Sequence, residues 1–298
     1  MEIRALSYVG VEATDLDAWS SFSTEFLGMP VERDGEDRLR LRMDERTYRI
    51  DVRRGDTDRL AWLGWEVSSA ADLASLERRL GGAGIETTHG TSEDAKDRGV
   101  VDLIRFDDPA GNHLEAFFGQ EADFRPITLT RPMEGYLTDE LGMGHAVIGV
   151  RNYRETFDFY VNTLGFRVSD TFKNFIAFLH CNPRHHSLAL VETDEPGLRH
   201  IMLETRAIDD VGMAIDIAKR RGELTRTLGR HTNDKAVSFY VETPGGWEIE
   251  YGWSGMQLDD EVAIVRQLAG PTSLWGHELV GGRELMSTAT ASTAKASG

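Results

Sequence analysis

The feature that most constrains the fold of this chain is an internal repeat. Residues 8–32 and residues 145–169 each contain an apolar segment, an amphipathic segment, the pair Leu-Gly and a second apolar segment. The glycines of the two pairs, Gly28 and Gly165, are separated by 137 positions (165 − 28 = 137) and suit the left-handed residue that ends a helix. Self-similarity at a fixed spacing predicts two halves with the same architecture.

Two further landmarks keep nearly the same spacing. Residues 62–67 resemble residues 200–205 (200 − 62 = 138), and each segment precedes a stretch with apolar residues at helical spacing. Residues 108–115 resemble residues 243–250 (250 − 115 = 135). Within each half, the series of one strand, one helix and about three strands occurs twice. The sequence therefore predicts an α+β fold built from four βαβββ modules.

The four modules are expected to form two domains. Residues 1–133 would make the N-terminal domain and residues 134–285 the C-terminal domain. The stretch 119–142 carries two prolines and little periodicity, which is typical of a linker. Residues 286–298 are rich in Ser, Thr and Ala and lack an apolar pattern, so they are expected to be disordered.

Composition excludes several classes of function. The formal net charge is −17 over 298 residues, so the chain repels nucleic-acid phosphates and anionic lipid surfaces. No apolar run is long enough to span a bilayer, and residues 1–4 lack the pattern of a secretory signal. A single cysteine, Cys181, excludes an internal disulfide framework. The expectation is a cytoplasmic enzyme without nucleic-acid or membrane partners.

Histidines concentrate in the second half. The chain has nine, and six of them lie between positions 145 and 231. These six are His145, His180, His185, His186, His200 and His231. The uneven distribution directs the search for catalytic chemistry to the second half.

The repeat allows the two halves to be compared position by position. Three landmark positions carry possible metal ligands in the second half, and only one of the three does so in the first. They hold Tyr8, Trp62 and Glu115 in the first half and His145, His200 and Glu250 in the second. This difference is expected when a metal-binding domain duplicates and one copy loses its metal.

Two histidines and one carboxylate are the ligand set of non-haem Fe(II) oxygenases. Three protein ligands on one face of an octahedron leave three positions open for substrate and O₂. Taken alone, His145 would more often be an ordinary core residue than a ligand, and Glu250 an ordinary charge at a strand end. The coincidence of His145, His200 and Glu250 with the repeat landmarks favours a metal site.

The motifs around these residues resemble those of a known family. The segment 229–250, with Gly-Arg-His at its start and Phe-Tyr-Val-Glu-Thr-Pro-Gly-Gly-Trp-Glu-Ile-Glu at its end, resembles the signature of the type I extradiol dioxygenases. The segment 181–187, which contains a His-His pair, resembles a second motif of that family. Residues 142–145 and 198–200 resemble its two histidine-ligand strands. The similarity extends over nearly the whole chain and is strongest to the 2,3-dihydroxybiphenyl 1,2-dioxygenase group.

The resemblance implies the vicinal oxygen chelate fold and extradiol cleavage of a 3-substituted catechol by O₂. It also implies Fe(II), with Mn(II) as a possible substitute. The expected partners are the catechol substrate, O₂ and further copies of the same chain, although the sequence does not give the number of copies. By the same resemblance, His145, His200 and Glu250 are the metal ligands and His186, His231 and Tyr240 are the catalytic residues. His186 would act as the acid–base residue beside the O₂ site, and the other two would hydrogen-bond the substrate oxygens.

Other residues near the motifs receive different interpretations. His185 should point to the opposite side of its strand from His186, because neighbouring side chains alternate. His180 and Cys181 are interpreted as packing residues. Lys235 and the short segment 170–177 depart from the family pattern, and both bear on the shape of the substrate pocket.

Three alternative functions remain at this stage. A steroid-catechol extradiol dioxygenase would share the chemistry and differ in substrate. A metal-free binding protein of the same fold would not need His145, His200 and Glu250 together with His186. A metal-dependent isomerase or lyase of the glyoxalase type would place ligands in both paired modules of a shared site and would need no His-His pair.

Overall fold

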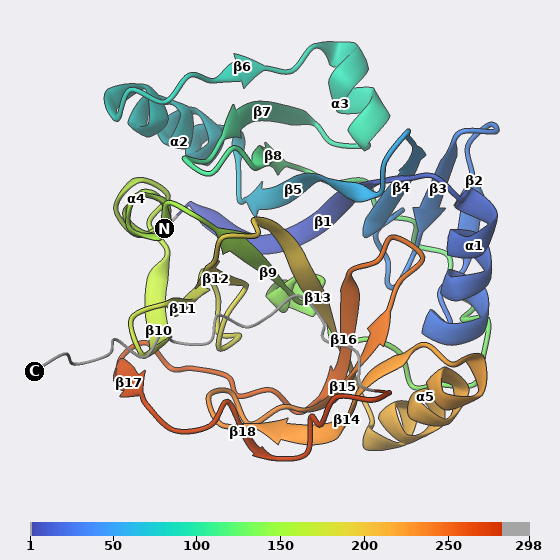
Figure 1. The fold of residues 1–298 in the computed structure, drawn as a ribbon. Coiled ribbons are helices and arrows are strands. Elements are labelled where there is room, and N and C mark those ends of the chain that lie inside the picture. Colours follow the sequence, from blue (N-terminus) through green and yellow to red (C-terminus); the bar gives the residue numbers. More distant parts are fainter. Residues whose placement is uncertain (1, 282–298) are drawn as a thin grey trace, which may run out of the picture.

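The structure is a computed structural model that describes residues 2–281. The segment 286–298, for which disorder is expected, lies outside the described residues. Two mixed β-sheets, one from each half of the sequence, form the centre of the molecule, with helices on their outer surfaces (Figure 1).

The first half forms an eight-stranded sheet in the order β2-β3-β4-β1-β5-β8-β7-β6. Within this sheet β1 pairs with β4 in parallel and with β5 in antiparallel orientation, so the two modules meet at the centre of the sheet. The strands are β1 (Ile3–Ala13), β2 (Val31–Arg33), β3 (Arg38–Leu41), β4 (Ile50–Arg54), β5 (Arg59–Val67), β6 (Thr88–His89), β7 (Asp102–Asp107) and β8 (His113–Phe118).

The second half forms a ten-stranded sheet in the order β17-β10-β11-β12-β9-β13-β16-β15-β14-β18. Without the added edge strands β17 and β18, this order is the order of the first sheet, which confirms the predicted repeat. The strands are β9 (His145–Val150), β10 (Arg167–Phe172), β11 (Ile176–His180), β12 (Leu188–Glu192), β13 (Gly197–Thr205), β14 (Leu224–His231), β15 (Val237–Glu242), β16 (Glu248–Trp253), β17 (Arg266–Leu268) and β18 (Ser273–Trp275).

Each module places its helix after its first strand. The helices are α1 (Leu16–Ser21) with its π-helical continuation η1 (Phe22–Leu27), α2 (Ala70–Gly82), α3 (Ser92–Arg98), the short 3₁₀ helix η2 (Asp139–Leu141), α4 (Tyr153–Asp158) with its π-helical continuation η3 (Phe159–Thr163), and α5 (Ile208–Arg221). Asp15 caps α1 by accepting a hydrogen bond from the backbone N–H of Ala18. Gly28 and Gly165 both have positive φ, as the sequence predicted. In the described part of the chain, no helix has the length and apolar character needed to cross a membrane.

The two halves share one hydrophobic core. Trp19 of α1 packs against Trp247 with ring centroids 5.5 Å apart, and Phe26 of η1 packs against Tyr251 of β16 at 5.6 Å. In the opposite direction, Phe166 packs against Trp65 of β5 at 5.0 Å. The same arrangement brings η1, the continuation of α1, into contact with α5 (Figure 1). Because each half covers apolar surface of the other, the sheets hold a fixed mutual position, which a cavity between strands requires.

The strand registers show which positions of the two halves are equivalent. Val9 of β1 pairs with Ile50, and Ala146 of β9 pairs with Leu188 at the same place in the second sheet. The preceding residues, Tyr8 and His145, are therefore equivalent. The ladders between β5 and β8 and between β13 and β16 also make Trp62 equivalent to His200 and Glu115 equivalent to Glu250.

Candidate metal centre

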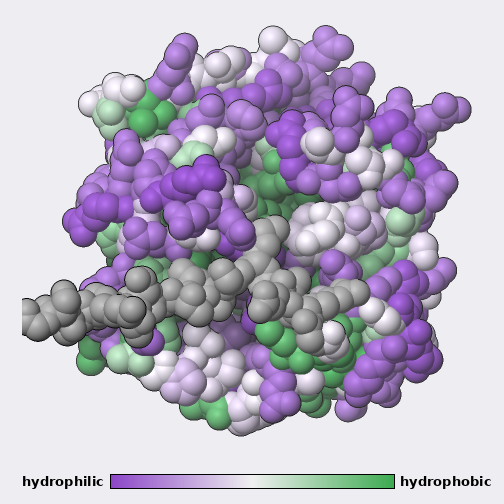
Figure 2. All heavy atoms as spheres, in the orientation of Figure 1, coloured by the Kyte–Doolittle hydropathy of each residue, from purple (hydrophilic) through white to green (hydrophobic). Residues whose placement is uncertain are grey.

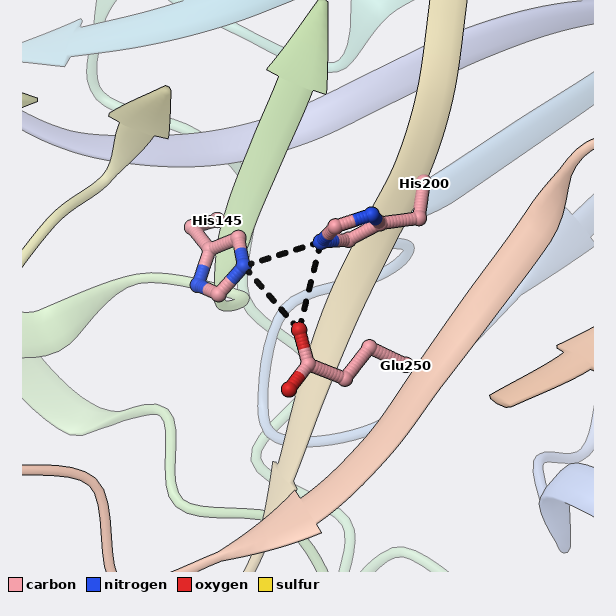
Figure 3. A group of neighbouring side chains, drawn as sticks. All are labelled: His145, His200 and Glu250. Atoms are coloured by element: carbon pink, nitrogen blue, oxygen red, sulfur yellow. Dashed lines mark hydrogen bonds and ion pairs between the residues drawn. The ribbon is translucent and has the colours of Figure 1, made fainter. Parts of the chain in front are cut away.

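His145, His200 and Glu250 meet on three adjacent strands at the centre of the second sheet. They come from β9, β13 and β16, and their side chains point toward one another (Figure 3). The His145 and His200 Nε2 atoms are 3.4 Å apart. Glu250 Oε2 lies 3.4 Å from His145 Nε2 and 3.2 Å from His200 Nε2. The three atoms thus form a nearly equilateral triangle.

This donor set fits a divalent metal ion. Donor atoms that lie roughly 2.1 Å from one metal at right angles to each other are about 3 Å apart, close to the observed edges. Two imidazoles and one carboxylate on one face match the Fe(II) facial triad, and the other face is left to substrate and O₂. Within the described residues, this is the group of histidines and acids whose ligand atoms converge on one point.

The second oxygen of Glu250 is held by the protein. Ser238 Oγ donates to Glu250 Oε1 at 2.6 Å, and His231 Nε2 lies 3.0 Å from the same oxygen. Burial raises the pKa of Glu250, but the charge of His231 and hydrogen bonds from the three nearby histidines lower this pKa well below its usual value. The carboxylate is therefore ionised, with Oε2 turned toward His145 and His200.

His231 and Tyr240 form a pair beside the triad. His231 Nε2 lies 2.8 Å from the Tyr240 hydroxyl, and both side chains line the cavity. Burial lowers the pKa of His231, but the negative charge of Glu250 outweighs this effect and raises the pKa to about 9. The Tyr240 ring also packs edge-on against His200, with centroids 5.2 Å apart. The pair can present N–H and O–H groups to a ligand on the open face.

His186 lies on the other side of the triad, where it packs over His145 with ring centroids 3.9 Å apart. His185 turns away from the cavity, as predicted, and its Nε2 lies 3.0 Å from the buried carboxylate of Asp170. The two histidines lie in the loop between β11 and β12 and not on a strand, so strand alternation is not the reason. The Nδ1 atoms of His185 and His186 are 3.1 Å apart. With a neutral His185 that donates its Nε2–H to Asp170, His185 Nδ1 would accept from His186 Nδ1–H. In that arrangement Nε2 of His186 carries the lone pair, and it has no hydrogen-bond partner among residues 2–281.

A cavity of about 400 Å³ opens over the triad. It is lined by all six predicted site residues, and the N-terminal half contributes Asp58, Arg59 and Leu60. Its apolar wall includes Val147, Phe172, Phe178, Ala189, Val191 and Leu198. The apolar wall and the polar floor together suit a small aromatic ligand with polar groups at one end.

The departures from the family pattern have different consequences. In the segment 170–177, Phe172, Phe175 and Ile176 line the cavity, so this segment does shape the pocket. Lys235 is absent from the cavity wall, and its Nζ donates to the backbone oxygen of Thr232 at 2.6 Å. Of these two departures, the segment 170–177 therefore bears directly on substrate binding, and Lys235 does not.

His180 and Cys181 are buried, as expected of packing residues. His180 also makes polar contacts, with Nδ1 2.6 Å from Ser169 Oγ and Nε2 3.0 Å from Asp260. Burial raises the pKa of the Cys181 thiol to about 12, so this sulfur is not a nucleophile near neutral pH.

In the first half, side chains of the protein occupy the position that corresponds to the candidate metal centre. Tyr8 donates to Glu115 Oε2 at 2.8 Å, and Arg98 donates to the same carboxylate through Nε at 2.9 Å and Nη2 at 2.9 Å. The Arg98 guanidinium lies 4.0 Å from the centroid of the Trp62 ring. An arginine thus supplies the positive charge that neutralises the carboxylate in this half.

Sequence reasoning missed three residues that support the site. Ser238 lies two positions before Tyr240 on β15, so strand alternation could have indicated that it faces the same side. Asp170 gave no signal, because its contact joins strand β10 to His185 in the loop between β11 and β12. Sequence reasoning assigned no role to His277. In the structure its ring packs over the His231 ring with centroids 4.2 Å apart, and its Nδ1 lies 2.7 Å from Ser273 Oγ.

Comparisons with known proteins agree with this geometry. Residues 142–251 match the profile of the Glyoxalase/Bleomycin resistance protein/Dioxygenase superfamily, and residues 6–55 match that of Dihydroxybiphenyl dioxygenase BphC D1. An iron-dependent extradiol dioxygenase of Rhodococcus jostii is 40% identical over 296 residues, which cover 93% of this chain and 98% of that protein. The chain belongs to the extradiol dioxygenases. It therefore has the vicinal oxygen chelate fold and Fe(II) as its cofactor.

Other relatives also support the assignment of this chain to the extradiol dioxygenases. A biphenyl-2,3-diol 1,2-dioxygenase of Metapseudomonas furukawaii is 41% identical over 298 residues, which cover 97% of this chain and 98% of that protein. The crystal structure of a halotolerant catechol dioxygenase has a TM-score of 0.90 at 33% identity and covers 94% of this chain and 95% of its own. The enzyme therefore performs extradiol cleavage of a catechol ring.

Proposed function

We propose that the enzyme cleaves a 3-substituted catechol with O₂ at an Fe(II) ion held by His145, His200 and Glu250. The bond broken would lie between the hydroxylated carbon and the substituted carbon next to it. The observation that carries this proposal is the triangle of donor atoms at the floor of an apolar cavity, with edges of 3.2–3.4 Å. The ion, when bound, would supply the sites at which catechol and O₂ are brought together for electron transfer between them.

The protein's own groups would handle the protons and the charge. A catechol must lose a proton to bind as a chelate, and the free Nε2 of His186 can accept one and later return it. On the opposite side of the triad, His231 and Tyr240 can hydrogen-bond a catechol oxygen. Tyr240 stays neutral near pH 7 because burial raises its pKa well above the usual value.

The wall of the cavity supports a substrate with a bulky apolar arm. Val147, Phe178 and Leu198 belong to this wall, and an aryl or alkyl arm would remove apolar surface from water against them. At about 25 cal/mol per Å², burial of even part of an aryl group supplies several kcal/mol of binding free energy. 2,3-Dihydroxybiphenyl is therefore the first candidate substrate, and an alkyl or fused-ring catechol, including a steroid catechol, is the second.

A substrate series tests this proposal. Enzyme loaded anaerobically with Fe(II) would be given 2,3-dihydroxybiphenyl, 3-methylcatechol, 1,2-dihydroxynaphthalene and catechol in air-saturated buffer, and kcat/KM would be measured from the yellow product. The biphenyl substrate should give the highest value and catechol the lowest. If catechol has the highest kcat/KM, the apolar-arm assignment fails although ring cleavage stands. If the series gives no yellow product, the catalytic proposal fails.

We also propose that identical chains assemble in solution. On the face drawn in Figure 2 polar residues predominate, and apolar residues gather low on that face near β14. Several large apolar side chains near the end of the described chain are exposed, among them Val262, Ile264, Val265, Leu274 and Trp275. Large exposed apolar side chains are typical of protein–protein contacts when they gather on one surface. Sedimentation of the purified enzyme would test this: a single species of 33.3 kDa at all concentrations would contradict it.

A further inference from the structure

Three arginines line the catalytic cavity, and they differ in their partners. Arg59 is paired with Glu12 through hydrogen bonds of 2.8 Å and 2.6 Å. Arg226 lies 3.5 Å from Glu248. Arg199 forms no ion pair within 4.0 Å among residues 2–281, although the charges of Glu195 and Glu248 act on it from farther away. It is therefore the cavity arginine that lacks a direct ion-pair partner in the described protein.

Arg199 is held in place by neutral acceptors. Its Nη2 donates to Thr193 Oγ1 at 2.9 Å and to the backbone oxygen of Glu195 at 3.0 Å. These contacts use one nitrogen of the guanidinium, and the remaining N–H groups have no acceptor in the described part of the chain. The side chain is partly buried, so it is positioned by the fold rather than free in solvent.

Arg199 lies on the cavity side of the sheet. His145, Val147 and Gly149 share one face of β9, because alternate residues point the same way, and the first two of them line the cavity. A Cβ atom added to Gly149 would lie 3.1 Å from Arg199 Nε and 2.7 Å from the Thr193 methyl group. The missing side chain at Gly149 therefore makes room for the Arg199 guanidinium on this face.

The backbone conformation at Arg199 explains why its side chain faces the cavity. In the ladder with β9, Leu198 pairs with Ile148 and His200 pairs with Val147, so Arg199 is the extra residue of a β-bulge. Bulges redirect a side chain from the position that regular alternation would give it. As a result, Arg199 and the candidate ligand His200, although adjacent in sequence, both line the cavity.

The repeat provides an internal comparison. Glu12 pairs with Arg53 in the first sheet, and Gly149 pairs with Val191 at the equivalent place in the second, so Glu12 and Gly149 are equivalent positions. In the first half this position holds Glu12, the carboxylate that pairs with Arg59. In the second half Gly149 offers no carboxylate, and Arg199, whose equivalent in the first half is Ala61, occupies the space beside it.

We propose that Arg199 binds an anionic group, such as a carboxylate, at the far end of the substrate's arm. This inference rests on the proposed cleavage of a 3-substituted catechol and adds the chemical class of its arm. Carboxylates form short, charge-assisted hydrogen bonds with guanidinium groups, and partial burial strengthens them. The substrate would then have a catechol at the metal, an apolar segment along the wall and an anion at Arg199.

The spacing along β9 sets the length of the arm. Gly149 is four residues from His145, which corresponds to about 13 Å along a strand. The catechol ring occupies the first part of this distance, and an extended chain covers roughly 1.2 Å per bond. The 3-substituent therefore reaches Arg199 with roughly five bonds between the ring and the carboxylate carbon.

Four acidic residues also line the cavity, Asp58, Asp234, Glu248 and Glu250, and each has partners of its own in the protein. Asp58 accepts hydrogen bonds from the backbone N–H of Thr14 at 3.0 Å and from its hydroxyl at 2.7 Å. Glu248 accepts from Thr225 Oγ1 at 2.5 Å. Because the whole chain carries a net charge of −17, it does not attract an anion from a distance. The effect of Arg199 is local and should appear in KM rather than in kcat.

The test compares an acid with its neutral isostere. The substrates are 5-(2,3-dihydroxyphenyl)pentanoate and 5-(2,3-dihydroxyphenyl)pentanamide, measured with the full-length Fe(II) enzyme and with its Arg199→Met and Arg199→Lys variants. Arg59→Met is the matched control, because Arg59 lines the same cavity with its guanidinium occupied by Glu12. Anaerobic titration of each compound gives Kd, which reports binding independently of ring cleavage.

The wild-type enzyme should prefer the acid over the amide by about tenfold or more in KM and Kd, as a charge-assisted hydrogen bond provides. The ratio of the value for the amide to the value for the acid, in KM and in Kd, should fall to about one in Arg199→Met. This ratio should recover in part in Arg199→Lys and stay at the wild-type level in Arg59→Met. An absent acid preference in the wild type, or an equal preference in Arg199→Met, overturns the proposal. If neither compound is cleaved but Kd still depends on Arg199, the failure lies in the proposed function and not in the anion site.

Discussion

Arg98 and Glu115 form a bidentate ion pair at the position of the first half that corresponds to the metal centre of the second. Their hydrogen bonds are 2.9 Å long from both Nε and Nη2 of the arginine, and both side chains are almost fully buried. Glu115 is equivalent to Glu250, so the duplicated carboxylate is kept while its cationic partner has changed. A guanidinium satisfies this buried negative charge in one half, and in the proposed function a divalent metal would do so in the other.

This pairing predicts that Glu115→Gln leaves iron binding intact and destabilises the fold. Metal analysis should find one iron per chain in the wild type and in Glu115→Gln, and loss of iron in Glu250→Gln. The free energy of unfolding of Glu115→Gln should fall by about 3 kcal/mol, because Arg98 remains buried without its partner. Two irons per chain, or iron loss in Glu115→Gln, would contradict this prediction.

The second prediction concerns His186. Replacing it with alanine should leave iron and catechol binding in place and lower turnover by about 10²–10⁴-fold, since the free Nε2 that accepts the substrate proton is lost. Single-turnover kinetics under air would measure this. His113→Ala is a suitable control, because His113 is exposed and its ring forms its hydrogen bond among the described residues with Asp107, far from the candidate metal centre.

His185→Ala provides the contrasting variant. It removes the group that holds His186 Nδ1, so it should have a smaller effect on turnover than His186→Ala. If His185→Ala abolished turnover and His186→Ala did not, the assignment of which histidine faces the cavity would be wrong.

A third prediction follows from the contact between Ser238 and Glu250. Ser238 Oγ is 2.6 Å from Glu250 Oε1 and orients the carboxylate toward the histidines. Ser238→Ala should weaken iron binding by about 10–100-fold, as is usual when a group that orients a metal ligand is removed. Competition with a chelator measures the affinity. Ser75→Ala, which removes a hydroxyl bonded to Glu2, is the control, and equal iron affinities in the two variants would refute the prediction.

The fourth prediction concerns acid stability and involves residues of the first half. Asp97 lies 2.8 Å from an Arg38 nitrogen and 2.6 Å from an Arg53 nitrogen. Burial raises the pKa of Asp97, but these arginines lower it below its ordinary value of 3.8. A carboxylate with a depressed pKa contributes stability above its unfolded-state pKa and loses it as the pH falls through the folded-state pKa.

The wild type should therefore be more stable than Asp97→Asn by about 1 kcal/mol at about pH 6, a modest value because Asp97 is partly exposed. The difference should shrink as the pH falls below about 3.8. Urea unfolding of both proteins over a pH series from about 3 to about 6 gives the free energy of unfolding at each pH. The series tests whether the difference between the two proteins shrinks toward low pH. A difference that grows toward low pH would contradict it.

The repeat made much of the fold and of the candidate site predictable from sequence. Gly28 and Gly165 indicated equivalent helix ends, and the strand orders of the two sheets confirm the duplication. The three candidate ligands were found because repeats keep their register, and a lost ligand is visible as a different residue at an equivalent position. The roles of His186, His231 and Tyr240 came from the family resemblance and remain predictions, although all three line the cavity.

The chain alone determined the periodicity, the duplicated architecture and the identity of the candidate ligands, since these depend on local pattern and on spacing. Only the tertiary structure decided which distant groups meet. Asp170 of β10 reaches His185 in a loop, Arg98 reaches Glu115 from the end of a helix, and a β-bulge turns Arg199 into the cavity. Such contacts arise from packing between elements, which no periodicity within one element encodes.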